Sequence, residues 1–171
     1  MTDLPKEVMA VEFLEQSNAI EGVFDKNSLV QAICAWEFLQ KQKNLTTRVI
    51  LKTHKILMFH QPLRPDERGY FRTVPVWVGA TYGMNHILIP SAIKNWLAVM
   101  NADYGKFTKD GVEEEIKDNH ILYERIHPFV DGNGRTGRMF MNWQRLKLGL
   151  PLMVIYNDQK QGYYKWFEKG L

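Results

Sequence analysis

Apolar residues recur at helical spacing along almost the whole chain, and this pattern limits the fold more than any other feature of the sequence. Leu29, Ile33, Trp36 and Leu39 are typical, because they follow one another at three or four residues and so share one face of a helix. Start and stop residues bound the helices. The predicted helices run from Asp3, with Pro5 in the first turn, to Gly22; from Asn27 or Ser28 onward; from Thr47 to Met58; from Pro90 onward; from Asp110 to Ile126; from Gly134 to Leu148; and from Asp158 to Lys169.

One segment near the middle of the chain has a different period. Val74, Val76 and Val78 alternate with their neighbours, and a period of two is typical of a strand. Pro75 lacks the N–H that a sheet interior needs, so we expect an edge strand or hairpin. Trp77 alternates outward from the valines, which suits a surface that meets a target or a second copy. The predicted fold class is all-α, with one small β-hairpin.

Charge and cysteine content narrow the class of protein. The net charge of +3 suits a phosphate-bearing ligand and is too small to indicate nucleic acid. No apolar run is long enough to cross a membrane, and the first residues do not resemble a signal peptide. Cys34 is the single cysteine, so we expect no internal disulfide, a buried thiol and a cytoplasmic location. The length of 171 residues indicates one domain over residues 1–171.

The segment His127–Arg138, with the sequence HPFVDGNGRTGR, concentrates the chemistry. Gly132, Asn133 and Gly134 tolerate backbone conformations that turn successive N–H groups toward one point. A helix begins at the same place, and its free N–H groups and dipole favour an anion. This turn is therefore a candidate anion site.

The charged residues around the turn indicate the kind of anion. Arg135 and Arg138 are three residues apart and share a helical face, so two guanidinium groups flank the turn and suggest a polyphosphate. Asp131 would repel phosphate unless it held Mg²⁺, and His127 is a titratable base just upstream. Together these residues predict a nucleotide–Mg²⁺ site with a general base.

Two other phosphate motifs compete with this interpretation. Gly132, Gly134 and Gly137 fit the dinucleotide fingerprint G-x-G-x-x-G, but that fingerprint follows a strand. Here the preceding segment, Glu113–Ile126, has helical spacing, so we reject it. No Gly-Lys-Ser or Gly-Lys-Thr follows, which excludes a P-loop.

The same segment resembles the signature of the Fic family, H-P-F-x-[DE]-G-N-G-R-x-x-R, with every defined position filled. The resemblance extends to the helical core, the central hairpin and the late position of the signature. It implies a Fic-type helical bundle and an enzyme, a protein adenylyltransferase. Such an enzyme transfers AMP from Mg-ATP to a Ser, Thr or Tyr hydroxyl of a target protein, or of the chain itself.

The resemblance also implies a role for each residue of the signature. His127 would deprotonate the target hydroxyl, which attacks the α-phosphorus of ATP. Asp131 would hold Mg²⁺ across the α- and β-phosphates. The anion hole would be lined by Gly132, Asn133 and Gly134, with Arg135 at the β-phosphate and Arg138 at the γ-phosphate. Doc-like phosphotransferases carry lysine at the position of Gly134, so glycine favours AMP transfer.

Two flanking segments resemble the family as well. Gly69–Gly79 is similar to the flap that registers the target by strand addition, and Val76, Trp77, Val78 and Gly79 would lie near the nucleotide. Tyr163 and Tyr164 match a tyrosine pair that lies near the nucleoside in relatives, although aromatic residues on a terminal helix are more often core.

Ser17, Glu21 and Gly22 match the inhibitory motif [ST]-x-x-x-E-[GN] of self-inhibited Fic proteins, and residues 1–24 would form the N-terminal inhibitory segment. A Glu21 carboxylate paired with Arg138 would occupy the guanidinium meant for the γ-phosphate and misplace ATP. The alternative is a surface acid near a helix C-terminus, where acids are disfavoured. In some relatives the same glutamate supports removal of AMP, so the favoured direction stays open.

Three hypotheses follow. AMP transfer is the first, and a Fic enzyme that mainly removes AMP or uses another nucleotide or phosphate donor is the second. A non-catalytic nucleotide-binding or toxin–antitoxin module is the third, and His127 argues against it because binding needs no base.

A homodimer is expected from the resemblance alone. Arg72 either anchors the flap or is solvated, and four other histidines, which lack metal-ligand spacing, are expected on the surface or satisfied in the core: His54, His60, His86 and His120.

Overall fold

The computed structural model describes residues 6–79, 81–105 and 107–168. Its helices are α1 (Lys6–Ile20), α2 (Lys26–Gln40), α3 (Thr47–Leu57), α4 (Ile89–Met100), α5 (Lys109–Ile126), α6 (Asn133–Lys147) and α7 (Lys160–Tyr164). Short 3₁₀ turns cover His86–Leu88, Asn157–Gln159 and Lys165–Phe167, and two strands, β1 (Trp77–Val78) and β2 (Thr81–Tyr82), form a hairpin. The predicted class, an all-α bundle with one small hairpin, is confirmed.

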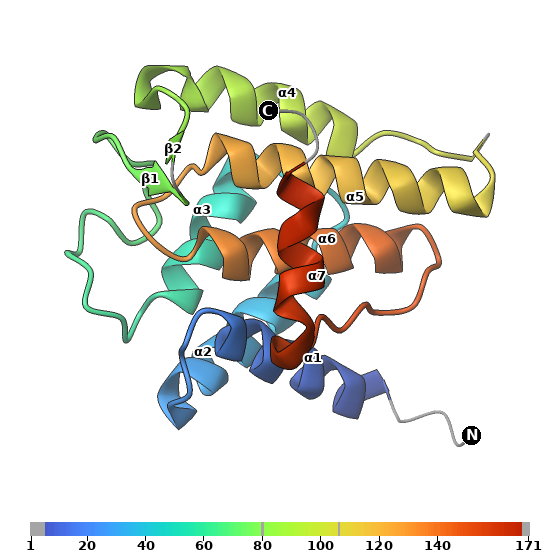
Figure 1. Cartoon of the computed structure of the whole chain (residues 1–171), viewed down its shortest axis with the longest axis horizontal. Helices are drawn as coiled ribbons and strands as arrows, with labels where there is room; N and C mark the ends of the chain where they lie inside the picture. Colours follow the sequence, from blue (N-terminus) through green and yellow to red (C-terminus); the bar gives the residue numbers. More distant parts are fainter. Residues whose placement is uncertain (1–5, 80, 106, 169–171) are drawn as a thin grey trace.

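Helix α6 is the central element of the bundle (Figure 1) and packs against α1, α2, α3 and α5. Every residue from Arg135 to Arg145 is buried, so burial favours partners inside the protein for the polar side chains of this stretch. Asn142 accepts from the N–H of Met153 at 2.7 Å and donates to the carbonyl of the same residue at 3.0 Å. These contacts tie the chain after α6 back onto the helix.

Side-chain caps fix where three helices begin. Asp25, Thr46 and Thr108 each accept a hydrogen bond from the backbone N–H three residues later, ahead of α2, α3 and α5, which satisfies a donor that the helix leaves free. Helix α2 begins at Lys26, slightly before the predicted Asn27 or Ser28, because Asp25 supplies the cap and Ser28 donates to it.

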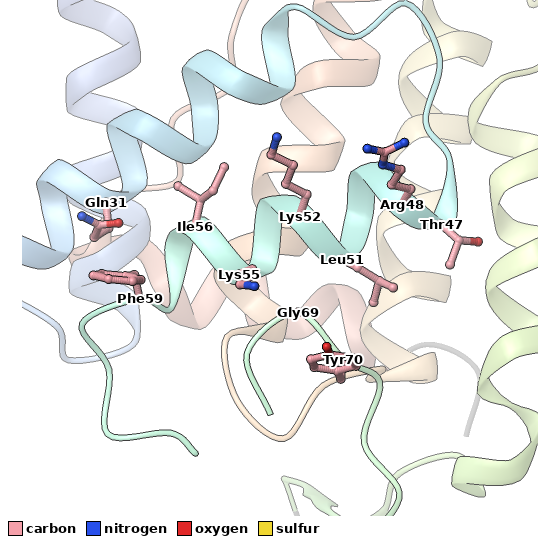
Figure 2. A pocket seen from close by; sticks show the side chains of 10 residues that line it. All are labelled: Gln31, Thr47, Arg48, Leu51, Lys52, Lys55, Ile56, Phe59, Gly69 and Tyr70. Atoms are coloured by element: carbon pink, nitrogen blue, oxygen red, sulfur yellow. The ribbon is translucent and has the colours of Figure 1, made fainter. Parts of the chain in front are cut away.

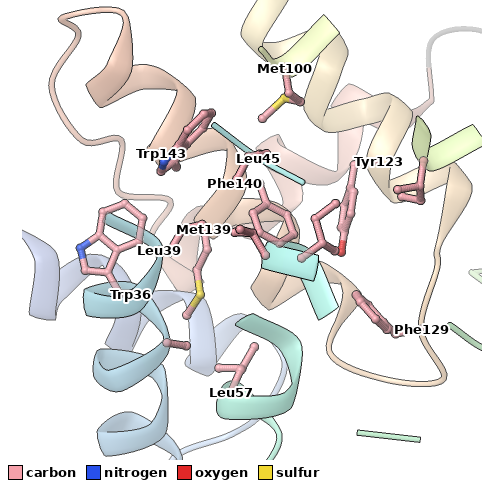
Figure 3. Close-up of a cluster of buried hydrophobic side chains, with 14 of the residues drawn as sticks. Trp36, Leu39, Leu45, Leu57, Met100, Tyr123, Phe129, Met139, Phe140 and Trp143 are labelled. Atoms are coloured by element: carbon pink, nitrogen blue, oxygen red, sulfur yellow. The ribbon is translucent and has the colours of Figure 1, made fainter. Parts of the chain in front are cut away.

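Aromatic side chains from several helices meet in the core (Figure 3). Phe140 of α6 has its ring centroid 5.4 Å from that of Tyr123 and 5.7 Å from that of Trp96. Trp36, Trp96 and Trp143 are all buried, which confirms their prediction as packing residues. Their burial fixes α6 against α2, α4 and α5.

The hairpin is shorter than the alternating sequence suggests. Trp77 pairs with Tyr82 and Val78 with Thr81 in antiparallel register, and Pro75 lies outside the paired residues. The rings of Trp77 and Tyr82 stack 4.1 Å apart and are more than 60% exposed. The outward orientation predicted for Trp77 is therefore confirmed.

Two predictions about the fold are wrong. Cys34 is exposed, because Ala32, Ala35 and Trp36 already fill the buried face of α2. Within the described residues the last helix is not continuous, since α7 is flanked on both sides by 3₁₀ turns; its predicted end at Lys169 lies outside the described residues.

The ends of the first helix are only partly described. Gly22 has φ +71° after α1, as expected for a C-terminal cap. The predicted cap at Asp3 and the position of Pro5 lie outside the described residues.

Among the residues that the structure describes, no helix is both long enough and apolar enough to cross a membrane.

Candidate active site

The loop between α5 and α6 places His127 at the end of α5. His127 adopts a left-handed conformation with φ 48°, the single positive φ outside glycine in the described chain, and its N–H donates to the carbonyl of Tyr123 at 3.0 Å. A helix precedes the glycine-rich turn, so the dinucleotide fingerprint is excluded.

A hydrogen bond from the ring of His127 determines which ring nitrogen carries the proton. Nδ1 lies 3.2 Å from the carbonyl oxygen of Glu124, and a carbonyl only accepts, so Nδ1 carries the hydrogen and Nε2 is left with a free lone pair. Burial lowers the pKa of His127 below its ordinary value of 6.5. His127 is therefore a neutral base at neutral pH.

Asn133 holds the loop in shape. Its amide accepts from the N–H of Phe129 at 2.8 Å and donates to the carbonyl of Phe129 at 2.9 Å. Gly132 has φ +82° and packs against Met58, whose Sδ would lie 2.7 Å from a Cβ at this position. The side chain of Asn133 is thus committed to the loop, and only the backbone of the turn is left to face an anion.

Asp131 and Arg135 form a pair beside this turn. One carboxylate oxygen of Asp131 accepts from the N–H of Gly132 at 2.6 Å, and the other lies 3.6 Å from Nη2 of Arg135. Asp131 is exposed, with 58% of its side chain accessible, whereas Arg135 is buried. Nε and Nη1 of Arg135 are buried without a partner among the described residues.

Arg138 is buried and held by the end of α1. Nε donates to the Ser17 hydroxyl at 2.9 Å, and Nη2 donates to the Ser17 carbonyl at 2.8 Å and to the Glu21 carboxylate at 2.7 Å. The carboxylate is 38% exposed and the guanidinium 2%, so Glu21 reaches in from the surface to the buried charge. The predicted pair between Glu21 and Arg138 is present.

Gly134 lies directly beneath the Glu21 carboxylate. A Cβ at Gly134 would overlap Oε1 of Glu21 and lie 3.0 Å from Nη1 of Arg138. Glycine is therefore the residue that lets a carboxylate approach the first turn of α6, where free N–H groups and the dipole favour negative charge.

A cavity of about 610 Å³ brings most of the predicted residues together. The predicted residues that line it are Trp77, Val78, Gly79, His127, Gly134, Arg138, Glu21, Tyr163 and Tyr164. Those that do not line it are Val76, Asp131, Gly132, Asn133, Arg135, Ser17 and Gly22. His127, Arg138, the hairpin residues and the two tyrosines thus face one space.

Tyr163 links α7 to the buried arginine. Its hydroxyl accepts from Nη1 of Arg138 at 3.4 Å and lies 2.8 Å from Nε2 of His120. Because the hydroxyl already accepts from Arg138, its own proton can go to His120. The neutral form of His120 suits this, since burial lowers its pKa to about 3.

Arg72 has a larger role than its sequence position indicated. It is buried, and its guanidinium donates to the carbonyls of His127, Val74 and Met84 at 2.7, 2.9 and 2.6 Å. Its own N–H donates to Pro128 at 2.9 Å. Arg72 therefore anchors both the segment Gly69–Gly79 and the loop between α5 and α6, and no local motif distinguishes it from a solvated arginine.

His54 is a second positioning residue that the sequence did not reveal. Nδ1 accepts from the N–H of Gly69 and Nε2 donates to the carbonyl of Asp131, both at 2.9 Å, so backbone groups fix the tautomer. The ring stacks on Phe129 with centroids 3.7 Å apart. Both ring nitrogens of His54 have hydrogen-bond partners in the core, which is one of the two environments predicted for this histidine.

Glu124 is another residue whose environment the sequence did not reveal. It lines the cavity, and its Oε1 is buried without a partner among the described residues. Burial raises its pKa to about 8, while the nearby Arg138 lowers it in part. Glu124 is thus a neutral acid at pH 7, which its place on an ordinary helical turn did not signal.

Known proteins share both the sequence and the fold. Residues 44–144, more than half of the chain, match the Fic/DOC family. Curated relatives include "Protein adenylyltransferase Fic" of Drosophila willistoni and of Drosophila melanogaster, 27% and 29% identical over 164 residues, 91% of this chain and 32% of each relative. The chain therefore spans about a third of their length.

Two solved structures have the same fold. Fic-1 from C. elegans superposes with a TM-score of 0.74 at 20% identity, over 94% of this chain and 55% of that one. A Fic domain containing signaling protein from Bacteroides thetaiotaomicron superposes with a TM-score of 0.79 at 21% identity, over 95% of this chain and 72% of that one.

Proposed function

Because the chain belongs to the Fic/DOC family, we propose that it is a protein adenylyltransferase, which transfers AMP from ATP to a hydroxyl of a target protein and rests in a self-inhibited state. Curated relatives with this name support the activity. The single observation that carries the proposal is the unprotonated Nε2 of His127 in one cavity with Gly134 and Arg138.

The reaction needs a base, an in-line approach and charge neutralisation. Nε2 of His127 accepts the proton of the target hydroxyl as that oxygen attacks the α-phosphorus. The bond from the α-phosphorus to the bridging oxygen breaks, and pyrophosphate leaves with the electron pair. The N–H groups at the start of α6 and the Arg138 guanidinium hold the phosphates, while the flap around Val78 and Gly79 receives the target backbone.

Mg²⁺ suits the residues present. Mg²⁺ typically takes one or two carboxylates and completes its shell with waters and substrate phosphates, and Asp131 offers one exposed carboxylate beside the turn. Among the described residues, no group of three acidic, histidine or cysteine side chains could enclose a metal alone. Asp131 would therefore hold the ion together with ATP, where it would neutralise phosphate charge.

Self-inhibition follows from competition for Arg138. The Glu21 carboxylate stands at the first turn of α6 and takes the Nη2 donor at 2.7 Å, which is where a terminal phosphate would bind. The tethered carboxylate is always present at high effective concentration, so ATP must displace it to bind with its phosphates in line. Residues 1–24 would then be the inhibitory segment of a single domain. A cytoplasmic location agrees with a lone, exposed Cys34.

The experiment uses ATP labelled on the α- or the γ-phosphate and three proteins: wild type, Glu21→Gly and His127→Ala. We expect α-label on protein with Glu21→Gly, little with wild type and none with His127→Ala. Label from the γ-phosphate alone would overturn AMP transfer. Labelling by His127→Ala equal to that by Glu21→Gly would contradict the assignment of His127 as the base. Labelling by wild type as fast as by Glu21→Gly would contradict self-inhibition by Glu21.

A further inference from the structure

A second hollow, of about 930 Å³, runs along α3 and shares no lining residue with the active-site cavity. Figure 2 shows side chains of α3 along its length, with Phe59 and Tyr70 at the edge. We call it the α3 groove, and the residues that matter for its chemistry are Arg48, Lys52, Lys55, Ile56, Phe59 and Tyr70.

The groove carries positive charge without compensation. Arg48, Lys52 and Lys55 follow one another at helical spacing and are exposed, so like charges adjoin on one face of α3. The described residues offer them no ion pair, and the amine of Lys52 only lies over the ring of Phe38, 4.8 Å from its centroid. No acid lines the groove, and the acids of the neighbouring loop already pair with Arg64.

The groove is also apolar. Leu51 and Ile56 are half-buried along it, and Phe59 and Tyr70 are 57% and 56% exposed. Large exposed aromatic residues beside a concave surface are typical of a protein-binding site. Acidic side chains would pair with the positive charges of the groove, and an apolar side chain would cover Phe59 and Tyr70. The complementary ligand is therefore an acidic, partly apolar peptide.

The groove is tied to the catalytic loop through a short stretch of chain. Gly69 has φ +80°, and a Cβ there would lie 2.8 Å from the Leu51 carbonyl, so the backbone sits directly on α3. Its N–H donates to His54, which holds the Asp131 carbonyl. Three residues later, Arg72 holds the carbonyl of His127. A ligand in the groove is therefore held in a fixed relation to the base.

We propose that the α3 groove is a docking site for an acidic, apolar segment of the protein whose hydroxyl enters the active site. This rests on the proposed function. The seven residue-to-residue steps from Tyr70 to Trp77 span at most about 25 Å, so the docking segment lies within roughly ten residues of the modified hydroxyl. Docking would raise the effective concentration of that hydroxyl at His127, which explains how a flap that reads mainly backbone could select its target.

The test measures binding without ATP, so it does not depend on AMP transfer. The probe is a fluorescein-labelled peptide that contains four Glu, two Leu and one Phe, followed by Gly and Thr residues, and the matched peptide carries Gln in place of Glu. Fluorescence anisotropy with wild type should show binding of the acidic peptide at least tenfold tighter than the Gln peptide, with a Kd below about 1 mM.

Charge-neutralised variants locate the site. The first variant combines Arg48→Gln, Lys52→Gln and Lys55→Gln, and its Kd for the acidic peptide should be at least tenfold higher than that of wild type. The control is Lys26→Gln, Lys94→Gln and Lys109→Gln combined, three exposed lysines elsewhere, which lowers the net charge equally and should leave Kd within twofold. Phe59→Ser with Tyr70→Ser should weaken binding several-fold with no change in melting temperature, since both side chains are exposed.

Several results would overturn the docking site: no binding of the acidic peptide, equal binding of the Gln peptide, or equal loss in the lysine control. Binding of phosphatidylserine vesicles or a single-stranded oligonucleotide in its place, abolished by the groove variant, would assign the groove to another class of ligand. His127→Ala should bind the peptide like wild type, which separates this proposal from the catalytic one.

Discussion

The proposed self-inhibited state depends on Arg138 and its partners. Glu21, Ser17 and Tyr163 form hydrogen bonds with its buried guanidinium. Removing one partner of a buried charge lowers the stability of the fold, because the charge is left buried without compensation. Ligand binding can restore that loss, because a ligand that binds only the folded state stabilises it.

We therefore expect Glu21→Gly to lower the melting temperature without nucleotide and to gain more from Mg-ATP than wild type does. A tenfold tighter Kd would add about 1.4 kcal/mol at saturating nucleotide. Differential scanning fluorimetry across ATP concentrations measures this. The exposed Glu114→Gln is the control, and equal ATP shifts in wild type and Glu21→Gly would contradict the competition.

His127 sets the acid side of the pH profile. Burial holds its pKa below the ordinary 6.5, so the neutral base predominates at pH 7 and is lost as the pH falls through this lowered pKa. The rate of AMP transfer by Glu21→Gly should be flat from pH 7 to 7.5 and decline below pH 6.5. A decline already centred above pH 7 would show that the base is not the neutral His127 seen here.

Glu124 sets the alkaline side. Its neutral form leaves the charge of Arg138 available to phosphate, and ionisation near pH 8 would add a buried negative charge beside Arg138, Glu21 and Tyr163. Because Glu21 is one of the groups that raise the pKa of Glu124, this ionisation should occur at a lower pH in Glu21→Gly, and the KM for ATP of that variant should be about threefold or more higher at pH 8 than at pH 6.5. Adding Glu124→Gln should abolish this rise, whereas adding Glu114→Gln should preserve it. A rise that survives Glu124→Gln would point to another group.

At the scale of elements, the flap and the catalytic loop behave as one unit because Arg72 bonds to both. Lysine keeps the charge but lacks the planar fork that reaches several carbonyls. Arg72→Lys should lower kcat by about 10–100-fold, because small displacements of the base and flap spoil the in-line geometry, and should cost about 1–3 kcal/mol of stability.

Steady-state kinetics and urea unfolding of Arg72→Lys in the Glu21→Gly background measure both effects. Arg64→Lys, at an exposed ion pair, should change neither, since surface pairs contribute little. A large loss of kcat with unchanged stability would be compatible with misplacement of the loop, whereas unchanged kcat would contradict the coupling.

At the scale of the whole molecule, buried neutral histidines should make stability depend on pH. Burial lowers the pKa of His54 to about 4 and of His120 to about 3, against 6.5 in the unfolded chain. The unfolded state therefore binds more protons below pH 6.5, and stability is full above that pH and falls as the pH drops toward 4.

The expected loss between pH 7.5 and 5 is about 2 kcal/mol for each histidine. Urea unfolding at the two pH values measures it, and the difference between them should shrink in His54→Gln and stay unchanged in His60→Gln, at an exposed position. A pH dependence that His54→Gln leaves intact would assign the loss to other groups.

The sequence alone determined the features that depend on local pattern. Helical spacing located the helices, and the fixed spacing of His127, Gly134 and Arg138 indicated a base, an anion turn and a cation on one stretch of chain. These conclusions hold because a helix start, its dipole and a three-residue spacing are properties of neighbouring residues. The wrong prediction of a buried Cys34 shows the limit of such patterns. Spacing indicates which residues share a helix face, but it does not indicate how much of the helix surface is buried.

Only the tertiary structure decided what surrounds that stretch. Ser17 and Glu21 reach Arg138 from 121 and 117 residues away, and the two carbonyl networks of Arg72 and His54 bring distant segments to the catalytic loop. Glu124 becomes a neutral acid only because the fold buries it beside Arg138, Glu21 and Tyr163. Burial and charge depend on the sum of all neighbours in space, and a single sequence does not list those neighbours.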